Sequence, residues 1–195
     1  EYNNTMKGMN VGERILASLF SATTARTAGF NSVDTGSLTS ASKLLTCVLM
    51  FIGGSPGSTA GGIKTTTIFI LVVSLWSGIT DRHKTAVFKR RFEDDAIKKA
   101  STVFTLNMFL AIFALFTILA ITDLSLSDVM FEVFSAIGTV GMTTGITRDL
   151  SSAARIIIMV LMFCGRVGSL SFALTFLQGK KDPPVYYPEE EISVG

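Results

Sequence analysis

The sequence predicts an all-α membrane protein built from repeated units of an outer helix, a re-entrant helix and an inner helix. Three observations predict this fold class. Only 16% of the 195 residues are charged, against about 25% in a typical soluble domain, and the charges cluster between long uncharged tracts. Basic residues gather in a loop at 79–100 and in the tail after residue 179. Finally, residues 139–165 repeat residues 27–53 without a gap.

Three regions are long enough to cross a bilayer, which requires about 20 mostly apolar residues in a helix. Residues 101–122 carry no charge, and residues 151–178 carry only Arg155 near their start and Arg166 inside. Residues 38–78 form the third region, which a glycine-rich stretch interrupts. We expect membrane helices in all three.

Two further apolar segments, at 12–24 and 126–138, are too short to span a bilayer. We expect each to be a re-entrant helix that enters the membrane and returns. This arrangement agrees with the charges, because basic residues mark the cytoplasmic side of a membrane protein. The loop at 79–100 and the C-terminus are therefore predicted to be cytoplasmic. The connections around 31–37 and 144–150, which hold Arg148 as their only basic residue, are predicted to lie outside.

The composition argues against several other classes of protein. A net charge of +2, without a basic surface interleaved with aromatic residues, argues against a nucleic-acid partner. Cys47 and Cys164 lie in apolar runs and are expected to be packing residues instead of metal ligands or a disulfide.

The internal repeat couples a Thr-x-Gly turn to the inner helix that follows it. Just upstream, Phe-Ser-Ala at 20–22 recurs at 134–136, so the short helix belongs to the repeat as well. Both copies run in the same sense through the membrane, so the repeat is parallel. The identical pairs are Thr27/Thr139, Gly29/Gly141, Thr35/Thr147, Leu38/Leu150, Ser40/Ser152, Ala41/Ala153, Val48/Val160, Leu49/Leu161, Met50/Met162, Phe51/Phe163 and Gly53/Gly165.

The two Thr-x-Gly turns are candidates for an ion filter. Non-helical backbone at membrane depth is tolerated only where protein buries it or where it lines a water-filled cavity. A turn at the end of a re-entrant helix can present carbonyl oxygens that replace the hydration shell of a cation, and glycine supplies the unusual backbone angles. Thr-Val-Gly at 139–141 resembles the potassium-channel filter, although Met142-Thr143 follows where that filter has Tyr-Gly. An ordinary interhelical loop is the alternative for each copy taken alone.

Several motifs together resemble the Trk/Ktr/HKT superfamily of cation transporters, most closely its bacterial Ktr potassium-uptake membrane subunit. They are RTAGFN at 26–31, GTVGMTTG at 138–145, the glycine-rich break in the first inner helix and Gly165-Arg166 in the second. The resemblance covers essentially the whole chain. It implies a potassium-channel-type fold with four pore units in pseudo-fourfold order around one pore. By this resemblance, residues 1–79 are the third unit, 80–96 a cytoplasmic loop, 97–178 the fourth unit and 179–195 a cytoplasmic tail.

The resemblance implies a transporter, not an enzyme, that takes up potassium across a bacterial plasma membrane. The transported K⁺ would bind backbone carbonyls of two filter strands, and Na⁺ would be stimulatory. Since the other two strands lie outside this sequence, a sodium-preferring or poorly selective relative is the alternative. The strands are Thr27, Ala28, Gly29, Phe30 and Asn31, and Thr139, Val140, Gly141, Met142 and Thr143.

The resemblance also implies partners. The membrane subunit would form a homodimer in the lipid bilayer, seated on a cytosolic ring of nucleotide-binding regulatory proteins of the Ktr type. ATP or ADP would bind to that ring, and this chain would carry no covalent cofactor. The basic loop at 79–100 is a plausible docking surface for the ring or for anionic lipid.

The glycine-rich stretch GGSPGSTAGGIKTTT at 53–67 resembles a phosphate-binding loop only superficially. That loop requires G-x-x-x-x-G-K-[ST] between a strand and a helix. Counting from Gly57, Ile63 stands where the lysine is required and Lys64 comes one residue late. A membrane ATPase with such a loop is therefore the weaker, different-class alternative.

We expect the glycine-rich stretch to break the first inner helix at Gly53-Gly54 and to lie in the cavity beneath the filter. The resemblance implies an intramembrane loop at this position, and that loop acts as the gate. The helix should resume near Ile63, and a passive helix kink is the alternative. The predicted gate residues are Gly53, Gly54, Ser55, Gly57, Ser58, Thr59, Ala60, Gly61, Gly62, Lys64 and Arg166.

Arg166 completes the predicted gate. It precedes Lys180 by about 21 Å of helix at 1.5 Å per residue, which is too far for its side chain to reach the cytoplasmic surface. A charge at that depth is costly, so it should face the interior and have a function. In the repeat Arg166 aligns with Gly54, so we expect it to bind loop carbonyls or hydroxyls and to hold the barrier closed. An interhelical bond without a transport role is the alternative.

Overall fold

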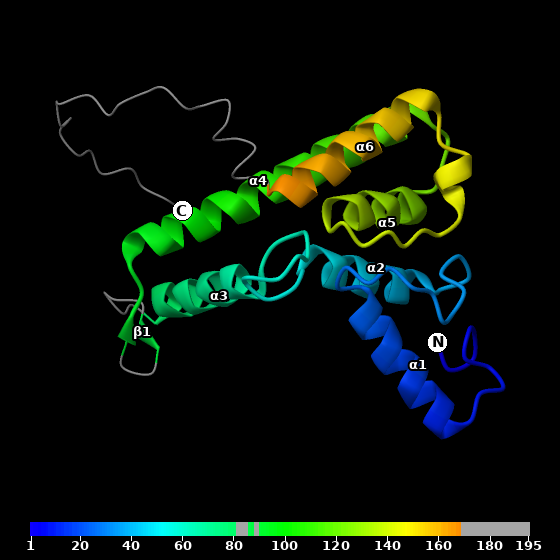
Figure 1. Ribbon diagram of the computed structural model, residues 1–195, viewed down its shortest axis with the longest axis horizontal. Helices are drawn as coiled ribbons and strands as arrows, with labels where there is room; N and C mark the ends of the chain where they lie inside the picture. Colours follow the sequence, from blue (N-terminus) through cyan, green and yellow to red (C-terminus); the bar gives the residue numbers. More distant parts are fainter. Residues whose placement is uncertain (81–85, 88–89, 169–195) are drawn as a thin grey trace.

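The computed structural model describes residues 1–80, 86–87 and 90–168 (Figure 1). The predicted tail at 179–195, the end of the last helix at 169–178 and part of the basic loop lie outside the described residues. The elements, in chain order, are α1 (Val11–Thr24), α2 (Ser40–Phe51), α3 (Thr65–Ile79), β1 (Ala86–Val87), β2 (Arg90–Arg91), α4 (Asp94–Ile121), α5 (Leu126–Ile137), the short 3₁₀ helix η1 (Ile146–Arg148) and α6 (Ser152–Val167).

The described part of the chain is helical apart from one small antiparallel pair that the all-α prediction did not include. In this pair β1 lies against β2, with Ala86 opposite Arg91. It connects α3 to α4 in the basic loop that the sequence predicts to be cytoplasmic, so the helical units themselves contain no strand among the described residues.

The two short helices form where the apolar segments predict them. The Asn10 amide before α1 donates to Glu13 Oε2 at 2.8 Å, and the Ser125 hydroxyl before α5 accepts from the Asp128 amide at 3.3 Å. These contacts satisfy amides that have no partner inside the helix. Each helix therefore begins at a defined point and delivers the chain into a Thr-x-Gly turn.

The outer helix α4 is longer than the uncharged segment that predicted it. It begins at Asp94, three residues before the predicted start of the fourth unit at 97, and the acidic residues Asp94 and Asp95 in its first turn interact favourably with the helix dipole. Within the described ranges, α4 alone is both long enough and apolar enough to cross a bilayer, while α2 and α3 are shorter apolar helices.

Helix α5 lies at the centre of the packing. It contacts α2, α4 and α6, and α3 runs beside the first half of α4 (Figure 1). Its side chains at Phe131, Val133 and Ile137 are fully buried. Since α2 and α5 come from different copies of the repeat, this packing joins the two units into one body.

The first inner helix is broken as predicted. α2 ends at Phe51 and α3 begins at Thr65, so the break is wider than the predicted interval from Gly53 to Ile63. In the other copy α6 continues past Phe163, the equivalent of Phe51, and ends at Val167, one residue before the described residues stop. The two inner helices therefore differ at the position where α2 ends.

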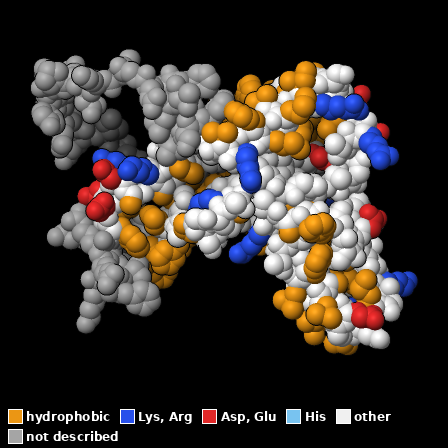
Figure 2. Space-filling model, in the orientation of Figure 1, with side chains coloured by type: hydrophobic (Ala, Val, Ile, Leu, Met, Phe, Trp, Pro, Cys, Tyr) orange, Lys and Arg blue, Asp and Glu red, His pale blue; other side chains and the backbone are white. Residues whose placement is uncertain are grey.

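Large apolar side chains cover much of the outside of the molecule. Figure 2 shows them over α1 and over the upper helices. On α4 they include Phe109, Phe113 and Phe116, and on α6 they include Met159 and Phe163. Exposed apolar surface of this extent is typical of helices that face lipid or further protein.

Candidate ion pathway

The two Thr-x-Gly turns share an unusual backbone conformation. Thr27 and Thr139 have φ angles of 73° and 51°, and in the described part of the chain no other non-glycine residue has positive φ. Gly29 and Gly141 have φ angles of 75° and 86°. A left-handed threonine is strained, and such strain persists where the surrounding structure imposes it, often at functional sites. The same strain at matching positions indicates that the repeat conserves a backbone geometry.

Between the two left-handed residues of each turn lies one residue, Ala28 or Val140, whose φ is not positive. No described residue donates a hydrogen bond to the carbonyls from Thr139 to Met142. The strand can therefore offer a row of oxygens to a cation.

The two strands lie against each other at their glycines. A side-chain carbon added to Gly29 would stand 2.2 Å from the Val140 carbonyl oxygen, so only glycine fits there. The same carbon on Gly141 would meet nothing within 4 Å. Gly29 is thus required for both close approach and backbone angle, whereas Gly141 is required for the angle alone.

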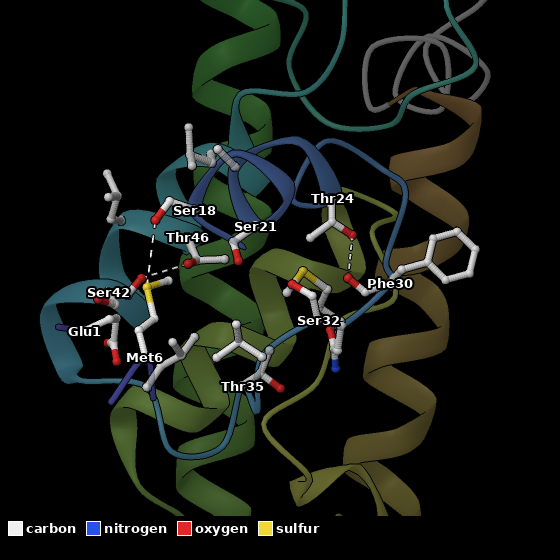
Figure 3. A pocket seen from close by; sticks show the side chains of 17 residues that line it. Glu1, Met6, Ser18, Ser21, Thr24, Phe30, Ser32, Thr35, Ser42 and Thr46 are labelled. Atoms are coloured by element: carbon white, nitrogen blue, oxygen red, sulfur yellow. Dashed lines mark hydrogen bonds between the residues drawn. The ribbon is translucent and has the colours of Figure 1, made fainter. Parts of the chain in front are cut away.

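Hydrogen bonds hold the C-terminal ends of the two strands in place. The Thr24 hydroxyl donates to the Phe30 carbonyl at 2.7 Å (Figure 3), and the Thr35 hydroxyl donates to the Thr143 carbonyl across the two units. Each of these predicted ion ligands is therefore already a hydrogen-bond acceptor. Asn31, the last residue of the first strand, lines a pocket next to that strand.

Sequence reasoning missed Glu132, which lies behind the second strand. This residue of α5 is 5% exposed, and its Oε1 accepts hydrogen bonds from the hydroxyls of Thr143 and Thr147, the latter at 2.9 Å. The sequence did contain a signal, because Glu132 is a carboxylate inside an apolar segment. An ionisable side chain in a membrane segment is energetically costly and indicates a functional site by default.

Sequence reasoning also missed a salt bridge between the two units. Lys43 Nζ on α2 lies 2.8 Å from Asp128 Oδ1 on α5, and the side chains are 11% and 23% exposed. The Ser125 hydroxyl donates to the other oxygen of Asp128 at 2.6 Å. The pair therefore links the helix that leads into the glycine-rich loop to the helix that carries a filter strand.

The glycine-rich loop packs directly against the second strand. A side-chain carbon on Gly61 would stand 2.3 Å from Thr139 Oγ1, and one on Gly62 would stand 3.5 Å from Gly138 Cα. Gly62 is left-handed, with a φ of 70°. The glycines thus allow the loop to lie close to Thr139, the first residue of the second strand.

Backbone hydrogen bonds close the base of the loop. The Gly53 amide donates to the Ile63 carbonyl at 2.8 Å, and the Ile63 amide donates to the Phe51 carbonyl at 3.0 Å. The Thr65 amide donates to the Gly54 carbonyl at 3.2 Å. Amides and carbonyls released by the broken helix are thereby paired inside the protein, as a membrane environment requires.

Two cationic side chains hold the tip of the loop. Arg166 Nη1 donates to the Thr59 carbonyl at 2.6 Å, and Lys64 Nζ donates to the Ser58 and Ala60 carbonyls at 3.2 and 2.5 Å. Three consecutive carbonyls are thus bound by positive charge. Arg166 binds a backbone oxygen and not a loop hydroxyl; the Ser58 hydroxyl donates to Ser55 instead.

The surroundings of the loop also differ from those of a phosphate-binding loop. Such a loop follows a strand and precedes a helix. Here the preceding element is the helix α2, and Lys64 is directed back onto the loop's own carbonyls. This geometry argues against the nucleotide-binding alternative.

Comparison with known proteins decides the family. The family model TrkH, described as cation transport protein, matches residues 1–182. The chain belongs to the TrkH family. This agrees with the resemblance that the filter-like and glycine-rich motifs predicted.

Several curated relatives of this TrkH-family chain are named as potassium uptake proteins, and others are named as cation transporters. Ktr system potassium uptake protein B of Bacillus subtilis is 36% identical over all of this chain and 44% of the relative. Potassium/sodium uptake protein NtpJ of Enterococcus hirae is 37% identical over 94% of this chain and 42% of the relative. The chain thus spans less than half the length of these relatives.

A solved structure supports the TrkH-family fold. The crystal structure of the potassium transporter TrkH from Vibrio parahaemolyticus matches with a TM-score of 0.70 at 20% identity, covering 90% of this chain and 39% of that one. At this identity the match concerns the fold alone.

Proposed function

We propose that this chain forms the third and fourth pore units of a potassium-uptake subunit in a bacterial plasma membrane. K⁺ passes along the carbonyls of the strands at 27–31 and 139–143, and two further strands complete the filter. The observation that carries the proposal is the matching left-handed geometry of Thr27 and Gly29 with Thr139 and Gly141 in strands that touch.

The loop at 53–64 is the gate of this pathway. Its Gly61 lies against Thr139, where the second strand begins, so the loop occupies the space through which a cation leaves the filter. Arg166 and Lys64 stabilise this position by charge-assisted hydrogen bonds to three successive carbonyls. Their positive charges also oppose a cation in the same space.

A sodium-permeable pathway is the second candidate. It is favoured by the name of one relative, potassium/sodium uptake protein NtpJ. The two strands contained in this chain are half of the proposed filter, so their geometry supports cation conduction more directly than it supports a choice between K⁺ and Na⁺.

The subunit works as a homodimer with a cytosolic nucleotide-binding ring. Two relatives are named as proteins B and D of a Ktr system, which supports a multicomponent transporter. The loop at 79–100 and the C-terminus face this ring, in keeping with their basic residues. The nucleotide binds to the ring, whereas Lys64 of this chain is occupied by its own loop.

The experiment is ion flux through the full-length protein reconstituted in vesicles, with vesicles lacking protein as the control. The proposal predicts K⁺ flux down its gradient that exceeds Na⁺ flux under the same driving force. Equal K⁺ and Na⁺ fluxes would favour the second candidate. The absence of flux for both ions, with and without the regulatory ring, would overturn the proposal.

A further inference from the structure

Glu132 is a buried carboxylate in the apolar centre of the protein. Its neighbours Phe131 and Val133 are fully buried, and Glu132 itself is 5% exposed. A buried carboxylate is destabilising unless hydrogen-bond donors satisfy it. The identity of those donors therefore indicates what this residue holds in place.

The donors come from the turn that follows the second strand. The hydroxyls of Thr143 and Thr147 both point to Glu132 Oε1 and lie 2.7 Å from each other. The Gly145 amide donates to Thr143 Oγ1 at 2.9 Å, so this hydroxyl accepts from one side and donates to the carboxylate on the other. The side chain of Thr143 is thereby fixed in one direction.

The backbone of Thr143 is fixed as well, because its carbonyl accepts from the Thr35 hydroxyl of the neighbouring unit. Thr143 is therefore held at its side chain by Glu132 and at its carbonyl by Thr35. These two restraints define the peptide plane at the outer end of the strand, immediately after the free carbonyls from Thr139 to Met142.

The equivalent position in the first unit is not a carboxylate. Through the match of Phe-Ser-Ala at 20–22 with 134–136, Ser18 stands where the other copy has Glu132. Ser18 lines a pocket of about 180 Å³ that also borders Phe30 and Asn31 of the first strand (Figure 3). The second strand is therefore hydrogen-bonded to a buried carboxylate of its own short helix, whereas the first strand borders a pocket at the equivalent place.

We propose that Glu132 is a positioning residue for ion selection, which fixes the outer end of the strand at 139–143 through Thr143 and Thr147. This inference rests on the proposed function, in which cations pass along that strand. Carbonyls that replace a hydration shell must keep their positions and number around the ion. Without Glu132 the strand is free to adjust to a smaller ion, so Na⁺ gains access while conduction continues.

The test is the ratio of K⁺ to Na⁺ flux in vesicles containing the full-length protein. Glu132→Ala should lower this ratio on the order of tenfold, because charged hydrogen bonds are among the stronger ones in proteins. Glu132→Gln, which keeps an acceptor oxygen, should restore part of the ratio. The matched control is Ser18→Ala, at the equivalent position of the other unit, which should leave the ratio unchanged.

A second pair of variants tests the same inference if Glu132→Ala does not fold. Thr147→Val removes one donor and should lower the ratio, while Thr147→Ser keeps the hydroxyl and should preserve it. Unchanged ratios in both Glu132→Ala and Thr147→Val, with a selective wild type, would overturn this inference alone. A wild type that passes neither ion would overturn the proposed function and, with it, this inference.

Discussion

Arg166 on α6 donates a hydrogen bond of 2.6 Å to the carbonyl of Thr59 in the glycine-rich loop, across 107 residues of sequence. The contact joins the inner helix of one unit to the broken inner helix of the other. A bond to a charged donor is stronger than a neutral one, and this bond opposes movement of the loop away from the strand at 139–143.

Replacing Arg166 should therefore open the pathway. Arg166→Ala is expected to raise K⁺ flux through the reconstituted full-length protein, because it removes both the bond to Thr59 and a positive charge from the cation's path. Arg155→Ala is the matched control, since Arg155 lies on the same helix and donates to the Arg148 carbonyl at its outer end. Equal fluxes in the two variants would contradict the role of Arg166.

Lys64 should contribute independently to the closed state. It binds the carbonyls on either side of Thr59, so Lys64→Met is expected to raise K⁺ flux by itself. The double variant with Arg166→Ala should exceed either single variant, because each side chain holds different oxygens. Flux in Lys64→Met at or below that of wild type would count against a clamp made of two cations.

The two filter glycines should respond differently to alanine. Gly29→Ala places a methyl group 2.2 Å from the Val140 carbonyl oxygen, whereas Gly141→Ala meets no atom within 4 Å. Both variants incur the left-handed penalty of about 1–2 kcal/mol. We expect Gly29→Ala to reduce K⁺ selectivity and thermal stability more than Gly141→Ala, measured as flux ratio and melting temperature. The reverse order would mean that the strands are not in contact.

The salt bridge between Lys43 and Asp128 should be measurable as a coupling between units. Removing one partner of a buried pair costs about 3–5 kcal/mol, and this partly exposed pair should lie toward the lower value. Lys43→Met and Asp128→Asn should each lower the melting temperature, and the double variant should lose less than their sum. Asp149→Asn, at an exposed carboxylate, is the control. If the losses in melting temperature of the two single variants simply add in the double variant, Lys43 and Asp128 do not stabilise each other.

The sequence predicted the features of this fold that depend on local composition. Both short helices and the break in the first inner helix follow from segment length, glycine content and the repeat. The predicted contact between Arg166 and the glycine-rich loop is present, although the Arg166 side chain is exposed in the described structure, and its depth in a membrane stays a prediction. Helix α4 begins earlier than hydropathy alone indicates, because its first turn is acidic and polar.

The contacts that depend on tertiary structure were not predictable in the same way. Lys43 and Asp128 are 85 residues apart and belong to different units, so no periodicity connects them. The Thr35 hydroxyl reaches Thr143 only because the two strands lie side by side. Glu132 was detectable as a charge in an apolar segment, but its partners could be identified only from the turn that folds over it.

The most direct test of this account is a deletion within residues 55–62 of the full-length protein, with K⁺ and Na⁺ fluxes measured in vesicles. The loop is proposed to gate and the strands to select, so the deletion should raise K⁺ flux while the ratio of K⁺ to Na⁺ flux stays at the wild-type value. Flux that remains at the wild-type level in a correctly folded deletion variant would contradict the proposal that this loop is the gate.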